Sequence, residues 1–118
     1  MNVFGEARDV LRGKIAAEAA PGTVVTMDPA YAPPCVLVDA ATNVERIGPG
    51  GYRTTINVVP MHPPPGNVAA LDWLGEMLEV VLTALGACSA PATAGTYGPK
   101  DAPCYRIPYT IQIADPNC

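Results

Sequence analysis

Hydrophobic residues near the start of the chain recur at steps of three and four positions. They are Val3, Ala7, Val10, Leu11 and Ile15. This spacing places them on one stripe of a helix, and the polar residues fall away from it. An N-cap at residue 2 and the Pro-Gly pair at 21–22 bound the pattern, which predicts an amphipathic helix over residues 2–20.

A second and wider apolar stripe follows Asn67, which is a good helix N-cap. Gly86 stands where a C-cap glycine belongs, so we expect a helix of about 19 residues between them. Asp72, Glu76 and Glu79 share the face opposite the leucines and are interpreted as a solvated helix surface. The predicted stripe consists of Leu71, Leu74, Leu78, Val81, Leu82 and Leu85, broadened by Ala70, Trp73 and Met77.

Strand patterns occupy much of the remaining chain. Residues 52–59 and 104–114 alternate with a period of two, and residues 35–38 form a continuous apolar run typical of a buried strand. Short strands are predicted at 23–27 and near 96–97. Pro108 has no N–H, so the last strand should be an edge or carry a bulge there.

Proline and glycine mark the connections between these elements. Residues 43–51 and 87–103 are predicted loops, and 28–34 has turn chemistry. The segment 60–66 is expected to be neither helix nor central strand, because its consecutive prolines favour an extended polyproline conformation. Long loops of this kind are either functional or disordered, and in an assembly subunit they would become ordered against neighbouring subunits.

The order of the elements is helix, two or three strands, helix, strand. It predicts a single α+β domain over residues 1–118, with a mostly antiparallel sheet and both helices packed on one face. The 118 residues leave no room for a second core.

Composition and charge narrow the functional classes. Hydrophobic residues make up 49% of the chain and charged residues 15%, which hints at a subunit whose surface is covered by partners. The net charge is −4 and the seven basic residues form no stripe, which argues against direct nucleic-acid binding. No apolar stretch spans a bilayer and no signal peptide is recognisable, so we expect a protein that is made in, and stays in, a cytoplasm.

Catalytic and metal-binding motifs are missing from the sequence. Cys35, Cys88, Cys104 and Cys118 form no CxxC pair, and we interpret them as reduced thiols, although two disulfides are formally possible. His62, the single histidine, stands among prolines with no adjacent nucleophile and is interpreted as an exposed loop residue. These observations predict a protein without enzymatic activity, cofactor or bound metal.

With its elements in this order, the chain resembles the tail terminator proteins of long-tailed (siphovirus-type) actinobacterial bacteriophages. The resemblance covers nearly the whole chain. It depends on the N-terminal helix and on the segments PPCVLVDA, GYRTTINVVP, WLGEMLEVVLTAL and YRIPYTIQIAD, with the proline linker between the second and third.

The resemblance implies a structural virion protein, located at the neck of the virion and assembled in the host cytoplasm. Subunits of that family form a six-fold ring that caps the head-proximal end of the tail tube and stops its polymerisation. The implied partners are further copies of the chain, the tail tube protein and the head connector or head-closure protein. DNA would pass through the acidic lumen without specific binding.

Candidate interface residues are large or stiff groups on or beside loops. The alternatives are another neck protein, either a head-closure protein or a head-to-tail adaptor, a small enzyme or binding domain, and a secreted disulfide-stapled domain. Trp73 is interpreted as a core residue or, if exposed, an interface anchor. The full candidate set is Tyr31, Arg46, Tyr52, Arg53, His62, Pro63, Pro64, Pro65 and Trp73.

Overall fold

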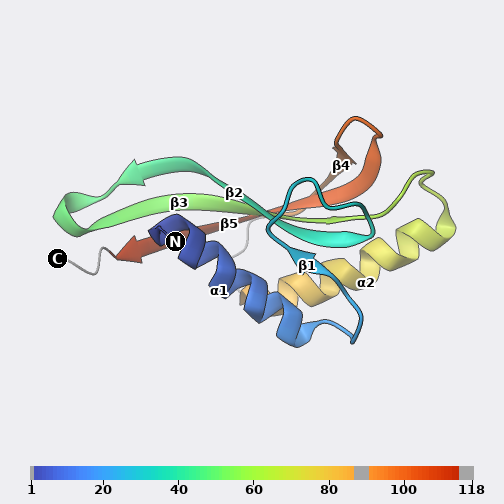
Figure 1. Ribbon diagram of the computed structural model, residues 1–118, viewed down its shortest axis with the longest axis horizontal. Coiled ribbons are helices and arrows are strands. Elements are labelled where there is room, and N and C mark those ends of the chain that lie inside the picture. The colour runs from blue at the N-terminus through green and yellow to red at the C-terminus, as the bar shows by residue number, and fades with distance from the viewer. Residues whose placement is uncertain (1, 87–90, 115–118) are drawn as a thin grey trace.

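A computed structural model describes residues 2–86 and 91–114 (Figure 1). Five strands form one sheet in the order β1-β2-β3-β5-β4, and only the β1–β2 pair is parallel. Both helices lie on one side of the sheet, so the predicted α+β class is confirmed. The elements are α1 (Val3–Glu18), β1 (Val25–Thr26), β2 (Cys35–Arg46), the 3-10 turn η1 (Gly48–Gly50), β3 (Gly51–Met61), α2 (Val68–Leu85), β4 (Thr93–Tyr97) and β5 (Ala102–Ala114).

Both helices begin and end close to the residues that the sequence indicated. The side chain of Asn2 accepts a hydrogen bond from the Gly5 N–H at 2.8 Å, and Asn67 accepts one from the Ala70 N–H at 2.9 Å. Gly86 has φ 65° at the C-cap of α2, a conformation that glycine adopts without steric cost. The predicted caps are therefore confirmed.

The larger core lies between the helices and the sheet. Its buried members are Leu11, Ile15, Val36, Val38, Ile56, Val58, Met77, Val81, Leu85 and Ile107. Three large residues of the predicted helix stripes are exposed, because the sheet contacts only one side of each helix. Val10 is 60% exposed on α1, and Leu71 and Leu82 are 59% and 38% exposed on α2.

The expectation that the chain has no room for a second core is wrong, because a second, smaller core covers the opposite face of the sheet. Its buried members are Cys35, Leu37, Val59, Met61, Ala102 and Cys104. The segment 29–33 and residues 97–102 border the same cavity of about 330 Å³ beside Met61, so they cover this face. With a core on each side, all four residues of the apolar run 35–38 are buried.

The prediction that residues 60–66 contain no central strand is wrong for its first two residues. Pro60 and Met61 end β3, the middle strand of the sheet, and both are buried. His62 donates its N–H to the Pro103 oxygen at 3.0 Å, so alternate residues of β3, including Pro60, face β5. Pro60 has no N–H to donate, and the pairing with β5 has a gap at Val59 and Pro60 before it resumes in the same register at Met61 and Cys104.

Pro108 lies in β5 opposite Asn57 of β3. The same alternation points its nitrogen away from β3, towards the side of β4. The pairing of β4 with β5 ends at Arg106, so within the described chain no strand meets Pro108 on that side. The sequence-based expectation of an edge is thus correct locally, and β5 keeps one register with β3 without a bulge.

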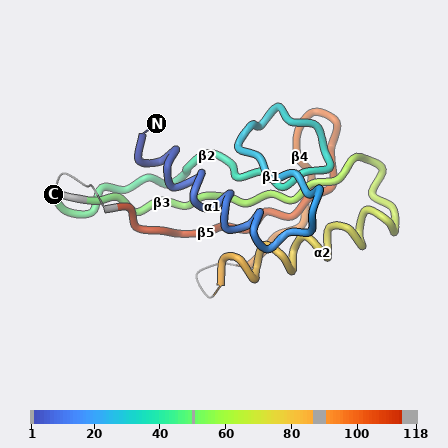
Figure 2. Tube along the Cα trace, turned by 60° about the horizontal axis from the view of Figure 1, so that its bottom comes forward, coloured from blue at the N-terminus to red at the C-terminus, as the bar shows by residue number. Residues whose placement is uncertain are grey.

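The predicted loop over 43–51 is largely strand. β2 continues to Arg46 and pairs with β3 up to Tyr52, with two register shifts on the way. Together β2, β3 and β5 form an arm that extends past the helices, in a molecule 49 Å long and 28 × 25 Å across (Figures 1 and 2). Pairing with β3 stabilises residues 43–46 as a strand, and the local composition of this segment gives no sign of that pairing.

Candidate functional site

The structure distributes the predicted interface residues over three separate places. Arg46, Tyr52 and Arg53 lie together near the tip of the β2–β3 hairpin. The Arg46 guanidinium lies over the Tyr52 ring at 5.9 Å, and Arg53 forms a 3.7 Å ion pair with Glu45. The Tyr52 ring also contacts Phe4 of α1, with 5.2 Å between centroids. These side chains therefore stabilise the hairpin, and Tyr52 is half-buried.

Tyr31 lies far from the hairpin tip in sequence, in the segment that covers the smaller core. It is 44% exposed and borders the cavity beside Met61. It is the one member of the predicted set with a large exposed aromatic surface.

The remaining candidates, His62–Pro65 and Trp73, lie where β3 leads into α2. His62 is half-buried, and its ring contacts the Trp73 ring with 5.6 Å between centroids. Nδ1 of His62 also lies 3.0 Å from the Pro63 oxygen. Trp73 packs against the larger core. His62 thus lies in the loop after β3, as expected, but it is half-buried and not exposed, and Trp73 is mainly a packing residue. A cis peptide joins Pro64 to Pro65.

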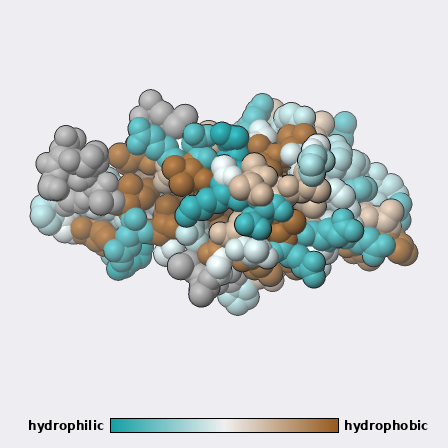
Figure 3. Space-filling model, turned by 90° about the horizontal axis from the view of Figure 1, so that it is seen from below, coloured by the Kyte–Doolittle hydropathy of each residue, from teal (hydrophilic) through white to brown (hydrophobic). Residues whose placement is uncertain are grey.

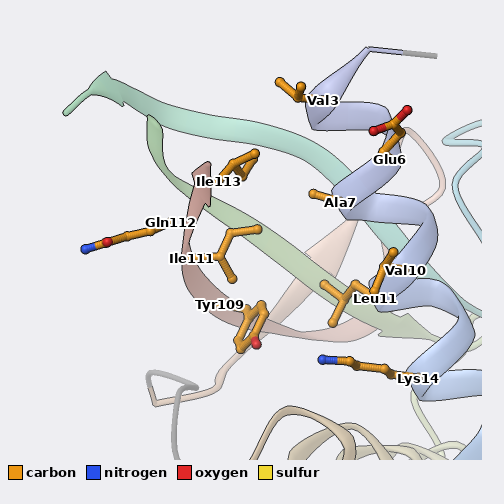
Figure 4. A pocket seen from close by; sticks show the side chains of 10 residues that line it. All are labelled: Val3, Glu6, Ala7, Val10, Leu11, Lys14, Tyr109, Ile111, Gln112 and Ile113. Atoms are coloured by element: carbon orange, nitrogen blue, oxygen red, sulfur yellow. The ribbon is translucent and has the colours of Figure 1, made fainter. Parts of the chain in front are cut away.

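A groove that the sequence did not indicate lies between α1 and β5. Its volume is about 420 Å³, and its walls are mainly apolar (Figure 4). The figure shows the α1 side chains facing Tyr109, Ile111 and Ile113, with Gln112 directed away. The lining residues are Val3, Glu6, Ala7, Val10, Leu11, Lys14, Tyr109, Ile111, Gln112 and Ile113.

The groove exists because the arm is longer than the helix layer. α2 covers β5 only in part, so the helix-facing side chains Ile111 and Ile113 lie beside α1 with an open side. Among residues 2–86 and 91–114, no strand pairs with the outer edge of β5 along the same stretch, since β4 pairs only up to Arg106. Thr110 and Gln112 direct their backbone N–H and C=O groups to this edge. An added strand could pair there, with the apolar groove beside it.

Charges of both signs border the groove. Glu6 and Lys14 lie two helical turns apart on α1, with the exposed Val10 between them. The arrangement provides an apolar contact with an acidic and a basic end, which can fix the orientation of a partner. Sequence reasoning assigned Val10, Ile111 and Ile113 to the core. The sequence does not show how far the arm extends beyond α2, and this length is what leaves these residues beside an open groove.

Two of the four cysteines lie in the smaller core. Cys35 and Cys104 are both buried and free, and both pair in register with Met61 from opposite sides. They are thus two strand spacings apart, about 10 Å, which is too far for a disulfide without backbone movement. Cys88 and Cys118 lie outside the described residues.

Burial raises the pKa of the Cys35 thiol to about 11, and it also raises the pKa of Cys104. The Cys35 thiol therefore stays protonated up to a higher pH in the folded chain, whereas it ionises near pH 9 when the chain unfolds. Its contribution to stability is therefore complete below pH 9 and is lost as the pH rises towards 11, by roughly 1.4 kcal/mol per pH unit. Urea unfolding between pH 8 and pH 11 should show this loss. Cys35→Ala should make the unfolding free energy depend less steeply on pH in this range. An unchanged slope would contradict the attribution of the loss to the Cys35 thiol.

Comparison with known proteins does not assign the chain to a family: no protein-family model matches it, and neither does any curated protein. In residues 2–86 and 91–114, no cluster of three or more His, Cys, Asp or Glu side chains could hold a metal ion. Within the same residues, no helix combines the length and the hydropathy needed to cross a membrane.

Proposed function

We propose that this chain is a structural subunit of a phage virion that assembles into a ring, as a tail terminator does. The observation that carries the proposal is the apolar groove between α1 and β5, bordered by the free edge of β5. A monomer gains nothing from leaving this groove open, whereas a neighbouring subunit could bury it. The type of assembly, a ring at the end of the tail tube, is inferred from the resemblance of the element order to that of tail terminator proteins.

A ring requires two different patches on each subunit, because its contacts are heterologous. The groove provides one. The end of the β2–β3 hairpin provides the other, since Val44 is 50% exposed there and is followed by Glu45 and Arg46. An apolar residue next to one acidic and one basic residue is complementary to a groove bordered by Glu6 and Lys14. Val44 borders a hollow with Phe4 and Arg8 of α1, so it lies on the same side of the sheet as the groove but at the β2 edge of the arm. The groove lies at the β5 edge, and one edge of each copy could therefore contact the other edge of the next copy round a ring.

Val10→Gln should abolish ring formation while leaving the fold intact. Val10 is 60% exposed, so its replacement costs the monomer little, but it places an amide in the middle of the groove. Light scattering of the purified chain over a range of concentrations, with and without tail tubes, measures the assembly. Leu71→Gln is the matched control, because Leu71 is 59% exposed on a helix and lies outside the groove.

Two outcomes would contradict the proposed interface. One is an assembly that Val10→Gln leaves unchanged, and the other is an assembly that both substitutions weaken equally. The terminator role has its own test, which is growth of tail tubes in the presence of the chain. A terminator arrests growth at substoichiometric amounts, whereas a head-to-tail adaptor binds the connector and leaves tube growth unaffected.

A further inference from the structure

α2 has two apolar faces, and among the described residues only one of them is buried. The inner face is buried against the sheet and consists of Ala70, Leu74, Met77, Val81 and Leu85. The outer stripe, which we define as Val68, Leu71, Gly75 and Leu82, is exposed. Val68 is 75% exposed. Figure 3, which views the molecule from the side of the helices, shows hydrophobic and hydrophilic patches interspersed over this side.

The spacing of the outer stripe is that of a helix–helix seam. Its members stand at a and d positions of a heptad series, in which the intervening position between Gly75 and Leu82 is Leu78, half-buried against the larger core. Side chains with heptad spacing can face the same partner helix over several turns. Scattered surface leucines show no such repeat and require no partner.

Gly75 lies in the middle of the outer stripe and is exposed. A Cβ at this position would meet nothing within 4 Å, so no close intramolecular approach requires glycine there. Glycine inside a helix weakens it relative to alanine. Between Leu71 and Leu82 the missing side chain leaves a notch, and such a notch lets a second helix pack closely against the backbone.

The charge beside the stripe indicates the chemistry of that second helix. Asp72, Glu76 and Glu79 are all exposed and lie along one border of the stripe, and α2 contains no lysine or arginine. A second copy of α2 would bring these carboxylates towards one another, which disfavours self-pairing through this face. A helix with basic residues beside its apolar stripe is complementary instead.

We propose that the outer stripe of α2 binds an amphipathic helix of a partner protein whose apolar stripe is flanked by lysine or arginine. This surface is separate from the groove between α1 and β5, so the inference goes beyond ring formation and does not depend on it. In a ring, the stripe would give each subunit a contact with a second protein.

Binding of a synthetic helix tests the proposal. The probe is a fluorescent peptide of about three heptads, with leucine at the seam and lysine beside it, and its anisotropy is followed on titration with the full chain at about 150 mM salt. We expect saturable binding in the micromolar range. A peptide with glutamate in place of lysine should bind at least about tenfold more weakly.

Three variants locate the contact. Leu71→Gln should weaken binding by about tenfold or more. Gly75→Gln should do the same while raising the melting temperature, because glutamine is the better helix former. Val10→Gln, on the equally exposed site of α1, should bind the peptide as the natural chain does even where it abolishes the ring.

Opposite results would overturn the proposal. They are no binding at about 100 μM chain, equal loss with Val10→Gln and Leu71→Gln, or full binding by Gly75→Gln. Loss of self-association in Leu71→Gln would also overturn it, since the stripe would then be a contact between copies. Because peptide binding and ring formation are separate readouts, failure of one does not imply failure of the other.

Discussion

Ile107→Ala is expected to reduce the free energy of unfolding by about 2–5 kcal/mol, the usual cost of such a truncation in a packed core. Ile107 is fully buried in β5, where it belongs to the larger core and pairs with Val58 of β3. Strands lie on both sides of β5 near this point, so the cavity cannot readily collapse. A small domain has only about 5–15 kcal/mol of stability, and this variant should therefore lose a large part of it.

The measurement is urea denaturation followed by the fluorescence of Trp73, the single tryptophan, which packs on the same core. Ile113→Ala is the matched control, because Ile113 shares the strand and the face but is only half-buried beside the groove. It should lose less than half as much stability. Equal losses at the two positions would show that the core extends along the whole arm.

Arg8→Ala is expected to cost about 3 kcal/mol, because hydrogen bonds from a charged donor contribute roughly 1.5–3 kcal/mol each. Nη2 of Arg8 donates to the Met27 and Val38 oxygens, both at 3.0 Å. The pairing of β1 with β2 ends at Leu37, so Arg8 satisfies a carbonyl just past that end and attaches α1 to two strands. Within the described chain, Nε of Arg8 is buried without a partner.

Arg8→Met is the matched control, because it keeps the aliphatic packing and removes both hydrogen bonds. If the hydrogen bonds dominate, the methionine and alanine variants should lose similar stability in the same denaturation assay. A methionine variant as stable as the natural chain would show that the side chain acts through packing alone. Since α1 forms one wall of the groove, loosening it should also weaken assembly.

Local features of the sequence determined the helices and most strands. Asn2 and Asn67 carry the capping oxygens, and Gly86 supplies the positive φ that ends α2, so both boundaries follow from single residues. Period-two alternation in 52–59 placed Thr54, Ile56 and Val58 on one buried face, as the structure shows. Such signals are readable because capping and alternation act over a few neighbouring residues.

The interaction surfaces could not be found in the same way. Val10 and Leu71 carry the same helical periodicity as their buried neighbours, yet both are exposed. Their exposure depends on how wide the sheet is under each helix and where α2 ends relative to β5. The position of Pro60 in a central strand likewise depends on the tertiary structure, because β5 must tolerate a missing hydrogen bond opposite Pro60. The sequence by itself determined the elements, their order and the class of fold, because these depend on local chemistry. The tertiary structure alone decided which apolar residues remain uncovered, because that depends on distances between segments far apart in the chain.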